Sequence, residues 1–290
     1  MRLTWTTRWQ NRHAADPPAS CLRTHGFLAS VFAVLLGVVA ANAQAQTLTR
    51  DQMAAFLTSA RIVDSRDIPK GVTRPVRVTL SDGSITHDAA FSSVDERVGI
   101  MRFKNGRVEL DFVDSYKHTV AAYRVAVLLG VDDMMPVTVE REWKQQKGSL
   151  TWWLDAKWDE EQRRKLKLNP PDPVAWTRQL SRMRVFAQLV ADTDRNLGNI
   201  LISEDWKLWM IDFTRAFRRT RDLLEPSGLT RCDRQLLARM RALTKEQLGD
   251  ATHPYIGGAE IDALLARRDR LVAFFEKRIA ERGDASVVFD

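Results

Sequence analysis

Residues 191–213 read ADTDRNLGNILISEDWKLWMIDF, and no other part of the chain says as much about the fold. The segment begins as a polar loop that carries Asp194 and, five residues later, Asn199. Two short apolar runs follow, Ile200–Ile202 and Leu208–Ile211, and a polar turn separates them. Apolar runs of this length on either side of a turn predict an antiparallel pair of strands.

The carboxylates and the carboxamide of this segment have the spacing that phosphoryl transfer needs. One carboxylate accepts the proton of the attacking hydroxyl, while a carboxamide and a second carboxylate hold Mg²⁺. Asp194 and Asn199 supply the first two groups, and Asp212 supplies the third, at the end of the second strand. Phe213 follows it, and Thr214 stands where kinases usually have glycine. The alternative interpretation is an Asp-rich loop that only caps a helix and forms turns.

The loop Asp194–Asn199 resembles the Asp-Arg-His-x-x-Asn loop of phosphatidylinositol 3-/4-kinases and HipA-type kinases, with Asn196 in place of the histidine. The longer string from Asp194 to Arg218 is similar to a bacterial group of kinase-like proteins related to those families. This resemblance extends back to about residue 68 and is weaker there. It implies a two-lobed protein-kinase-like fold of the α+β class, with a sheet-rich N-terminal lobe and a mainly helical C-terminal lobe.

The same resemblance implies a role for each polar residue of the loop. Asp194 would be the catalytic base, and Arg195 would act beside it by orienting the loop or the phosphate, together with Asp192. Asn199 and Asp212 would bind the metal. ATP and Mg²⁺ are the cofactors that kinases of this kind use.

Alternation of apolar and polar residues before the loop predicts a lobe that is mostly antiparallel sheet. We expect a short helix capped by Thr49 and a longer helix at Tyr116–Leu129, whose apolar residues fall on one face. The predicted strands lie at residues 74–80, 84–94, in a pair around 98–112, and at 137–141 and 149–154.

A charged, proline-rich stretch at residues 157–173 separates this sheet from a helical region. Pro173 suits the first turn of a new helix, which we expect at Val174–Ala191. A last helix is predicted at Ala259–Arg282, where Gly283 would end it. The expected organisation is an N-terminal segment of residues 1–45, a sheet-rich lobe of residues 46–156 and a helical lobe of residues 157–290.

The first 45 residues predict export. Four arginines precede the apolar run Phe27–Ala41, which ends in Ala41-Asn42-Ala43 with small residues at the minus-three and minus-one positions, as is typical of a secretory signal peptide. The alternative is an uncleaved membrane anchor at the N-terminus. Export would place the domain in the periplasm or cell envelope, where ATP is scarce. The sequence therefore does not identify the phosphate donor.

Charge and composition argue against several classes of function. The net charge of +7 falls to +4 without residues 1–43, because Lys plus Arg drops from 44 to 40 and Asp plus Glu from 37 to 36. Arginine clusters at 218–221 and 267–268 are interpreted as solvated helix faces that could touch a membrane surface, and not as a nucleic-acid site. Cys232 would be the only cysteine left, and the histidines lack metal-ligand spacing, so we expect neither a disulfide nor a zinc site.

The sheet-rich lobe lacks an ion pair that active kinases need. Kinases hold the nucleotide phosphates with a sheet lysine that pairs with a helix glutamate. The resemblance places these positions at Ser92 and Thr119, which carry small hydroxyls instead. Lys104 or Lys117 could enter the cleft from elsewhere. Loss of both partners strands no charge, as expected of a pseudokinase.

Two functions therefore stay open. The first is an ATP- and Mg²⁺-dependent phosphotransferase that acts on a hydroxyl of an unknown protein, lipid or small-molecule substrate. The alternative is an exported pseudokinase that serves as a binding or scaffold module without catalysis. A hydrolase is not expected, since the chain has neither a Gly-x-Ser-x-Gly elbow nor a His-Glu-x-x-His zinc motif. The substrate and the oligomeric state are not predicted.

Overall fold

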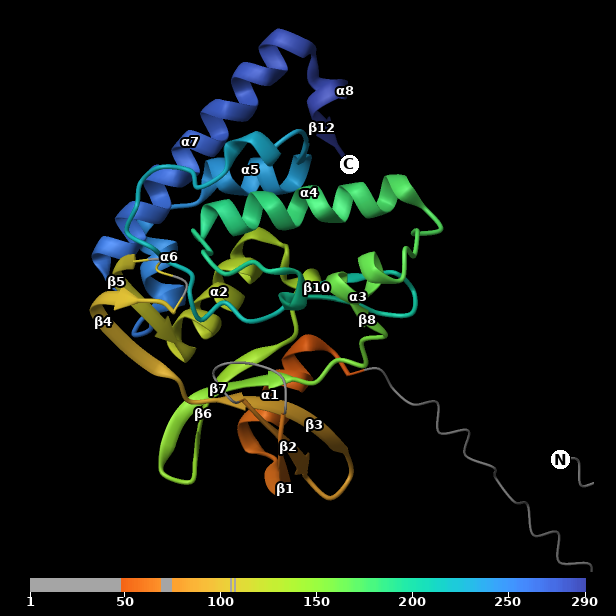
Figure 1. Cartoon of the computed structure of the whole chain (residues 1–290), viewed down its shortest axis with the longest axis vertical. Coiled ribbons are helices and arrows are strands. Elements are labelled where there is room, and N and C mark those ends of the chain that lie inside the picture. The colour runs from red at the N-terminus through yellow and green to blue at the C-terminus, as the bar shows by residue number, and fades with distance from the viewer. Residues whose placement is uncertain (1–47, 69–74, 105, 107) are drawn as a thin grey trace, which may run out of the picture. The chain divides into compact units, whose positions relative to one another are not determined.

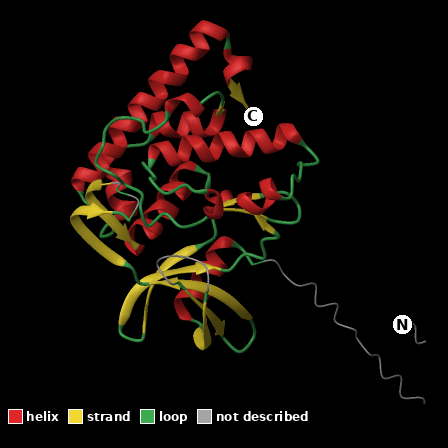
Figure 2. Ribbon diagram, in the orientation of Figure 1, coloured by secondary structure: helices red, strands yellow, loops and turns green. Residues whose placement is uncertain are grey.

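The computed structural model describes residues 48–68, 75–104, 106 and 108–290 (Figure 1). Residues from Thr47 to Asp290 form one compact unit. The predicted signal segment, residues 1–45, lies outside the described residues, and so do residues 69–74. Strands dominate the first part of the described chain and helices the second (Figure 2), as the α+β prediction requires.

A five-stranded antiparallel sheet in the order β1-β2-β3-β7-β6 forms the N-terminal part of this unit. Its strands are β1 (Arg61–Asp67), β2 (Val76–Ser81), β3 (Thr86–Ser92), β6 (Thr138–Trp143) and β7 (Gln146–Trp152). Four of them confirm predicted strands, with ends shifted by a few residues. Strand β1 is not predicted from the sequence, because it lies at the sheet edge and its side chains are almost all exposed.

Helix α1 (Arg50–Ser59) covers one face of this sheet. Its predicted cap is confirmed: the Gln52 amide donates to the Thr49 hydroxyl at 3.2 Å, and the Thr49 amide donates to the Gln52 side chain at 2.8 Å. The helix buries Phe56 and Leu57 against the apolar side chains of the sheet, which are Val78, Leu80, Ala89, Phe91 and Leu150. A large apolar side chain contributes about 1.5–3 kcal/mol when it is fully buried.

A separate two-stranded hairpin follows β3 and leads into the second helix. Strands β4 (Asp95–Arg102) and β5 (Val108–Ser115) pair antiparallel, which confirms the strand pair predicted around residues 98–112. Helix α2 spans Tyr116–Leu129, as predicted, because local signals fix both of its ends. The Ser115 hydroxyl accepts a hydrogen bond from the Lys117 amide at 3.3 Å, and Gly130 adopts φ +64° after the last turn.

The rest of the chain is mainly helical. Its helices are α3 (Glu160–Lys165), α4 (Pro173–Leu189), α5 (Arg234–Ala242), α6 (Lys245–Thr252), α7 (Gly258–Arg282) and α8 (Asp284–Val287). Short strands also occur, namely β8 (Trp158–Asp159), β9 (Ile200–Ile202), β10 (Leu208–Met210), β11 (Cys232–Asp233) and β12 (Val288–Phe289). Helix α4 begins at Pro173 as expected, because the Asp172 carboxylate accepts hydrogen bonds from the amides of Val174 and Ala175.

Helix α7 confirms the predicted last helix and corrects the interpretation of the arginine clusters. Arg267 was expected on a solvated face, yet its side chain is fully buried. The guanidinium donates to the carbonyls of Leu189 at 2.8 Å and of Arg218 at 2.9 Å, and also to that of Thr220. The last carbonyls of a helix have no partner within the helix. Arg267 supplies a donor to one of them, the carbonyl of Leu189 at the end of α4.

Membrane spans and disulfides are not found in the described ranges. None of the helices there combines the length and the apolar character that a bilayer crossing needs. Cys232 is a free, buried thiol, and burial raises its pKa to about 12.

Candidate active site

The loop with the predicted site residues lies between the end of α4 and strand β9. Strand β9 pairs antiparallel with β10, as predicted. The Ile211 amide then donates to the Asn199 carbonyl at 3.1 Å, which fixes the end of the second strand beside the loop. Asp212, which follows Ile211, is thereby placed beside Asn199, thirteen positions earlier in the chain. The pairing of two short strands is therefore what assembles the site.

Arg195 locks these two parts of the site together. Its Nη1 donates to the carbonyls of Asn199 at 2.8 Å and Ile211 at 2.7 Å, and its Nη2 donates to the Asp212 carbonyl at 3.2 Å. Nε and Nη2 also contact Asp192 Oδ2, at 2.7 and 2.5 Å. All five N–H donors of the guanidinium are thus engaged by the protein. The structure places Arg195 as a group that orients the loop, with no donor left for a phosphate.

Asp192 also holds the loop in this arrangement. Its side chain is fully buried, and its second oxygen accepts a hydrogen bond from the Asp194 amide at 3.0 Å. A buried carboxylate is stable only when it is paired and hydrogen-bonded, and Asp192 has both kinds of partner. Both carboxylate oxygens of Asp192 are therefore engaged by the loop itself.

Asp194 and Asn199 lie side by side with oxygen atoms still available. The Asn199 Nδ2 donates to the Asp194 carbonyl at 3.0 Å, so the amide oxygen of Asn199 faces away from that contact. Among the described residues, the Asp194 carboxylate receives only a long contact of 3.4 Å from the Asn196 amide group. A carboxylate that is half-buried and almost free of donors can accept a proton from a bound hydroxyl.

Asp212 has the environment of a functional carboxylate. Its backbone is in the left-handed region, at φ +55°, which Asp tolerates better than most residues. The Thr214 hydroxyl donates to Oδ1 at 2.9 Å, and no described residue donates to Oδ2. Burial raises the pKa of this carboxyl, and the nearby charge of Asp194 adds to the effect. Phe213, which is fully buried against Phe186, holds the segment in place.

The oxygen atoms left free at this site suit a magnesium ion. Asp212 Oδ2 and the amide oxygen of Asn199 are hard ligands, and Mg²⁺ is usually held by one or two protein groups plus water and phosphate oxygens. The described residues contain no group of three or more histidine, cysteine or carboxylate side chains that could hold a metal alone. A site of this kind would therefore bind its metal together with a phosphate ligand.

Asp114 is a further carboxylate of this region that sequence reasoning missed. It lies at the end of β5, beside the Thr214 side chain, and its Oδ1 is buried without a hydrogen-bond partner. Burial raises the pKa of its carboxyl, and the charge of Asp212 does so further. No local pattern could have identified it, because it comes from a strand almost a hundred residues before Asp212.

The β4–β5 hairpin is fastened to the segment that follows Asp212. The Ser115 amide donates to the Thr214 carbonyl at 2.9 Å. Glu109 pairs with Arg215 at 2.5 Å and with Arg218 at 3.2 Å, and all three side chains are largely buried. Arg218 is therefore a structural residue and not part of a solvated face, which is the second correction to the arginine clusters.

The positions expected for the kinase ion pair carry no charge. The hydroxyls of Ser92 and Thr119 are both buried without a hydrogen-bond partner. Lys117, one of the candidate substitutes, pairs with Asp95 at 2.7 Å and is about half exposed. Lys104, the other, is exposed near the tip of the β4–β5 hairpin. Buried polar atoms without partners often mark the place of a missing ligand or water.

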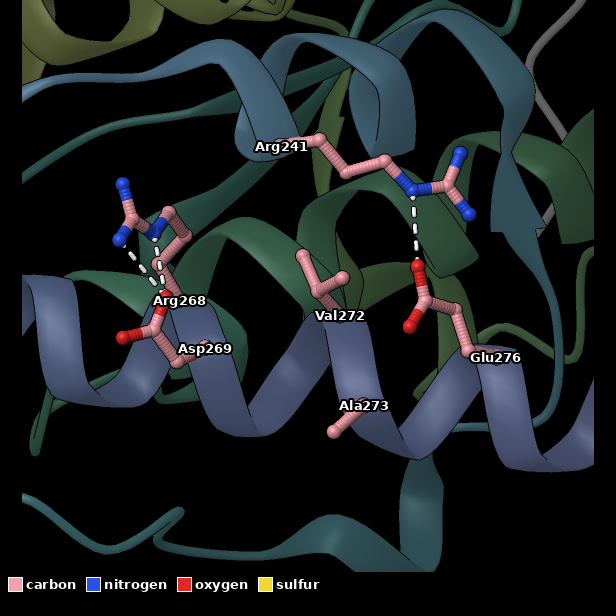
Figure 3. Close-up of a pocket in the computed structure, with 6 residues that line it drawn as sticks. All are labelled: Arg241, Arg268, Asp269, Val272, Ala273 and Glu276. Atoms are coloured by element: carbon pink, nitrogen blue, oxygen red, sulfur yellow. Dashed lines mark hydrogen bonds and ion pairs between the residues drawn. The ribbon is translucent and has the colours of Figure 1, made fainter.

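The concave feature drawn in Figure 3 lies elsewhere. It is lined by Arg241 of α5 and by five residues of α7, which are Arg268, Asp269, Val272, Ala273 and Glu276. Arg241 pairs with Glu276 at 3.0 Å across it. It contains none of the predicted site residues and no unpaired charged group that would recognise a ligand.

Comparison with models of known protein families gives no match, and comparison with curated protein sequences gives none either. Solved structures do match. The structure of hydra Fam20 with sugar has a TM-score of 0.60 at 15% identity and covers 82% of this chain and 91% of that one. The Golgi casein kinase has a TM-score of 0.57 at 13% identity, covering 82% of this chain and 78% of that one.

A second structure of the Golgi casein kinase, with Mn/ADP bound, matches over the same shares at 12% identity and a TM-score of 0.57. Identities this low show the fold alone. The chain has a protein-kinase-like fold of the α+β class, as the loop and its two strands predicted.

Proposed function

We propose that the protein is a kinase-like phosphotransferase that moves a phosphate group from ATP, with Mg²⁺, to a hydroxyl of its substrate. The observation that carries this proposal is the lock around Arg195, which holds Asp194, Asn199 and Asp212 together while leaving their oxygen atoms free. A fold whose only task is packing has no need to keep a carboxylate such as Asp212 in a site where burial raises its pKa and one of its oxygens has no donor among the described residues.

The chain's own residues divide the work of this reaction. Asp194 accepts the proton of the substrate hydroxyl. The oxygen of that hydroxyl then forms a bond to the transferred phosphorus, while the bond from this phosphorus to the rest of the donor breaks. Asn199 and Asp212 would hold the metal, and Arg195 keeps them in register with Asp194. When bound there, Mg²⁺ would supply positive charge to the phosphate oxygens.

Solved structures with the same fold support the proposed binding of a nucleotide and a divalent metal. A Golgi casein kinase of the same fold has been determined with Mn/ADP bound. The finer placement also belongs to the proposal: the loop from Asp194 to Asn199 favours atypical kinases of the phosphatidylinositol 3-/4-kinase and HipA type. The substrate class stays a hydroxyl of a protein, lipid or small molecule, met outside the cytoplasm if residues 1–45 direct export.

A second candidate rests on Ser92 and Thr119. Two uncharged hydroxyls at the expected lysine and glutamate positions favour a pseudokinase, a binding or scaffold module that keeps the loop but does not transfer phosphate. It predicts that nucleotide binding, if any, does not depend on Mg²⁺.

The test is calorimetry of ATP binding with and without Mg²⁺, on the protein and on its Asp212→Ala variant. Binding that requires Mg²⁺ and is lost in the variant supports the phosphotransferase. Absence of binding under both conditions would sink it and leave the pseudokinase. Asp222→Ala, which removes an exposed aspartate that pairs with Arg270 of α7, is the matched control.

A further inference from the structure

The two faces of the β4–β5 hairpin differ in what they contact. Neighbouring side chains on a strand point to opposite faces, so Glu109 points away from the face that carries Val108 and Leu110. Glu109 pairs with Arg215 and Arg218, and its face is therefore the one packed on the segment of these arginines. The other face is turned away from that contact. Figure 1 draws the hairpin at the left edge of the described chain.

The outward face of the hairpin is apolar and exposed. Ile100 stands directly opposite Leu110 in the register. Arg102 stands opposite Val108, two residues nearer the turn, so the four side chains share this face. The exposed fraction is 55% for Ile100, 48% for Val108 and 65% for Leu110. Single exposed apolar residues are ordinary, whereas three that adjoin on one face mark a contact surface.

Charge is distributed unevenly along the hairpin. Arg102 and Lys104, at the turn end, are exposed, and neither has an ion-pair partner among the described residues. Two exposed carboxylates, Glu96 and Asp111, lie beyond the apolar pairs at the end nearer α2. The apolar face therefore adjoins a basic turn, and the acidic side chains lie behind it.

This pattern selects among the surfaces that could cover the face. A second copy of the chain would bring like cations together, because a two-fold contact pairs a patch with itself. A specific protein interface needs about 800 Å² on each partner, more than the exposed parts of four side chains supply. An anionic bilayer matches both properties, since its phosphates attract lysine and arginine and its interface takes up apolar side chains.

We propose that the β4–β5 hairpin docks on the surface of a bilayer that contains anionic lipids. Ile100, Val108 and Leu110 enter the boundary between headgroups and acyl chains, while Arg102 and Lys104 reach the lipid phosphates. The backbone stays at the depth of the headgroups, because open strand edges are not stable in hydrocarbon. Docking brings the candidate site, to which the hairpin is fastened, to the membrane surface. The inference does not depend on the proposed phosphotransferase function.

Amide hydrogen exchange of the full chain tests the inference with two probes. One is an excess of vesicles of phosphatidylcholine, and the other is vesicles of phosphatidylcholine and phosphatidylglycerol in equal parts. We expect exchange in residues 98–102 and 108–112 to slow about fivefold or more with the mixed vesicles and by less than about twofold with the neutral ones. Exchange is read peptide by peptide, so contact of vesicles with another segment does not imitate this result.

Variants separate the apolar contribution from the charged one. Leu110→Ser should abolish the slowing, because it removes the most exposed of the three apolar side chains. Leu166→Ser is the matched control, since Leu166 is 59% exposed just after α3, and it should behave as the unaltered chain. Exchange of Arg102 and Lys104 together for glutamine should weaken the affinity for mixed vesicles more than about tenfold. All these positions are exposed, so thermal scans should give an unchanged Tm for each variant.

Three outcomes would overturn the inference. Unchanged exchange in the hairpin with mixed vesicles shows that it does not meet a membrane. Equal slowing by neutral and mixed vesicles removes the part assigned to anionic lipid. Slowing that appears without vesicles as the protein concentration rises assigns the face to a second copy of the chain. None of these results bears on phosphoryl transfer, because the samples contain no nucleotide.

Discussion

Buried charged residues set the chemistry of this protein at the residue scale. Arg195 and Asp192 are mutually paired, whereas Asp212 is half-buried with only a hydroxyl and an amide of Thr214 as donors to its carboxylate. Such a carboxylate costs stability and is kept where a ligand will later neutralise it. Arg267 is the opposite case, a buried cation neutralised only by carbonyl dipoles.

Replacement of Asp212 by asparagine should abolish Mg²⁺-dependent ATP binding and yet stabilise the free protein. Burial raises the pKa of this carboxyl, so its ionised form is unfavourable in the folded state at neutral pH. We expect a gain of about 1 kcal/mol, or roughly 2–4 °C in Tm for a domain of this size. The gain should shrink as pH falls through the raised pKa, because the wild-type carboxyl then takes up a proton.

Thermal scans of both proteins between pH 7 and pH 4 measure this. An Asp212→Asn chain less stable than the wild type at pH 7 would contradict the account of a strained, functional carboxylate. Asp222→Asn, at an exposed position, should change neither property.

Arg267→Met should destabilise the protein by about 3 kcal/mol. The change leaves the carbonyls of Leu189, Arg218 and Thr220 buried without their donor, and each unsatisfied group costs about 1–3 kcal/mol less any relaxation. Urea unfolding gives the value. Arg270→Met on the same helix, with a side chain 56% exposed, is the control and should change stability by less than about 0.5 kcal/mol.

At the element scale, the β4–β5 hairpin matters because of what it fastens. Two-stranded hairpins are marginal alone, and this one gains stability by pairing Glu109 with Arg215 and Arg218. Arg215 also stacks over Phe112 at 4.9 Å. The hairpin thus limits how far the chain after Asp212 can move, so site geometry depends on an element that carries none of the predicted site residues.

Glu109→Gln should loosen that segment. Two largely buried arginines then lack their carboxylate, at an expected cost of about 2–3 kcal/mol. Amide hydrogen exchange should speed up in both hairpin strands and in residues 213–218, with little change in α7. Glu96→Gln, an exposed change on the same hairpin, is the control. Equal exchange in wild type and Glu109→Gln would show that the pairing does not hold the segment.

On the scale of the whole molecule, pH should act through a buried histidine. His118 in the first turn of α2 is 4% exposed, and burial lowers its pKa to about 4. Its folded pKa lies below the unfolded value, so the unfolded chain binds more protons and stability is lost as pH falls from 6.5 towards 4. The full loss is about 3 kcal/mol. His118→Asn should flatten urea midpoints between pH 7 and pH 5, and an unchanged slope would rule out His118 as the cause.

The sequence alone determined what depends on neighbours in the chain. Helix α2 was predicted from the period of its apolar residues, α4 from Pro173 and α7 from its period and Gly283, and these signals act within a few residues of one another. The spacing of Asp194, Asn199 and Asp212 was likewise readable, since one short hairpin joins them. Local hydrogen bonds and apolar periodicity involve residues that are close together in the sequence. The features that depend on them, the helices and the spacing of the site residues, were therefore predictable.

Tertiary structure decided what depends on segments far apart. Asp114 meets the Thr214 side chain, and Arg267 is buried among carbonyls from two other segments, across separations that no local pattern reports. Arg77 contacts Asp88 and Trp153 only because β2 pairs with β3 in this register and the chain after β7 passes beside it. An arginine reads the same in a sequence whether it is solvated or buried, because its partners, and not its neighbours in the chain, supply the free energy that buries it.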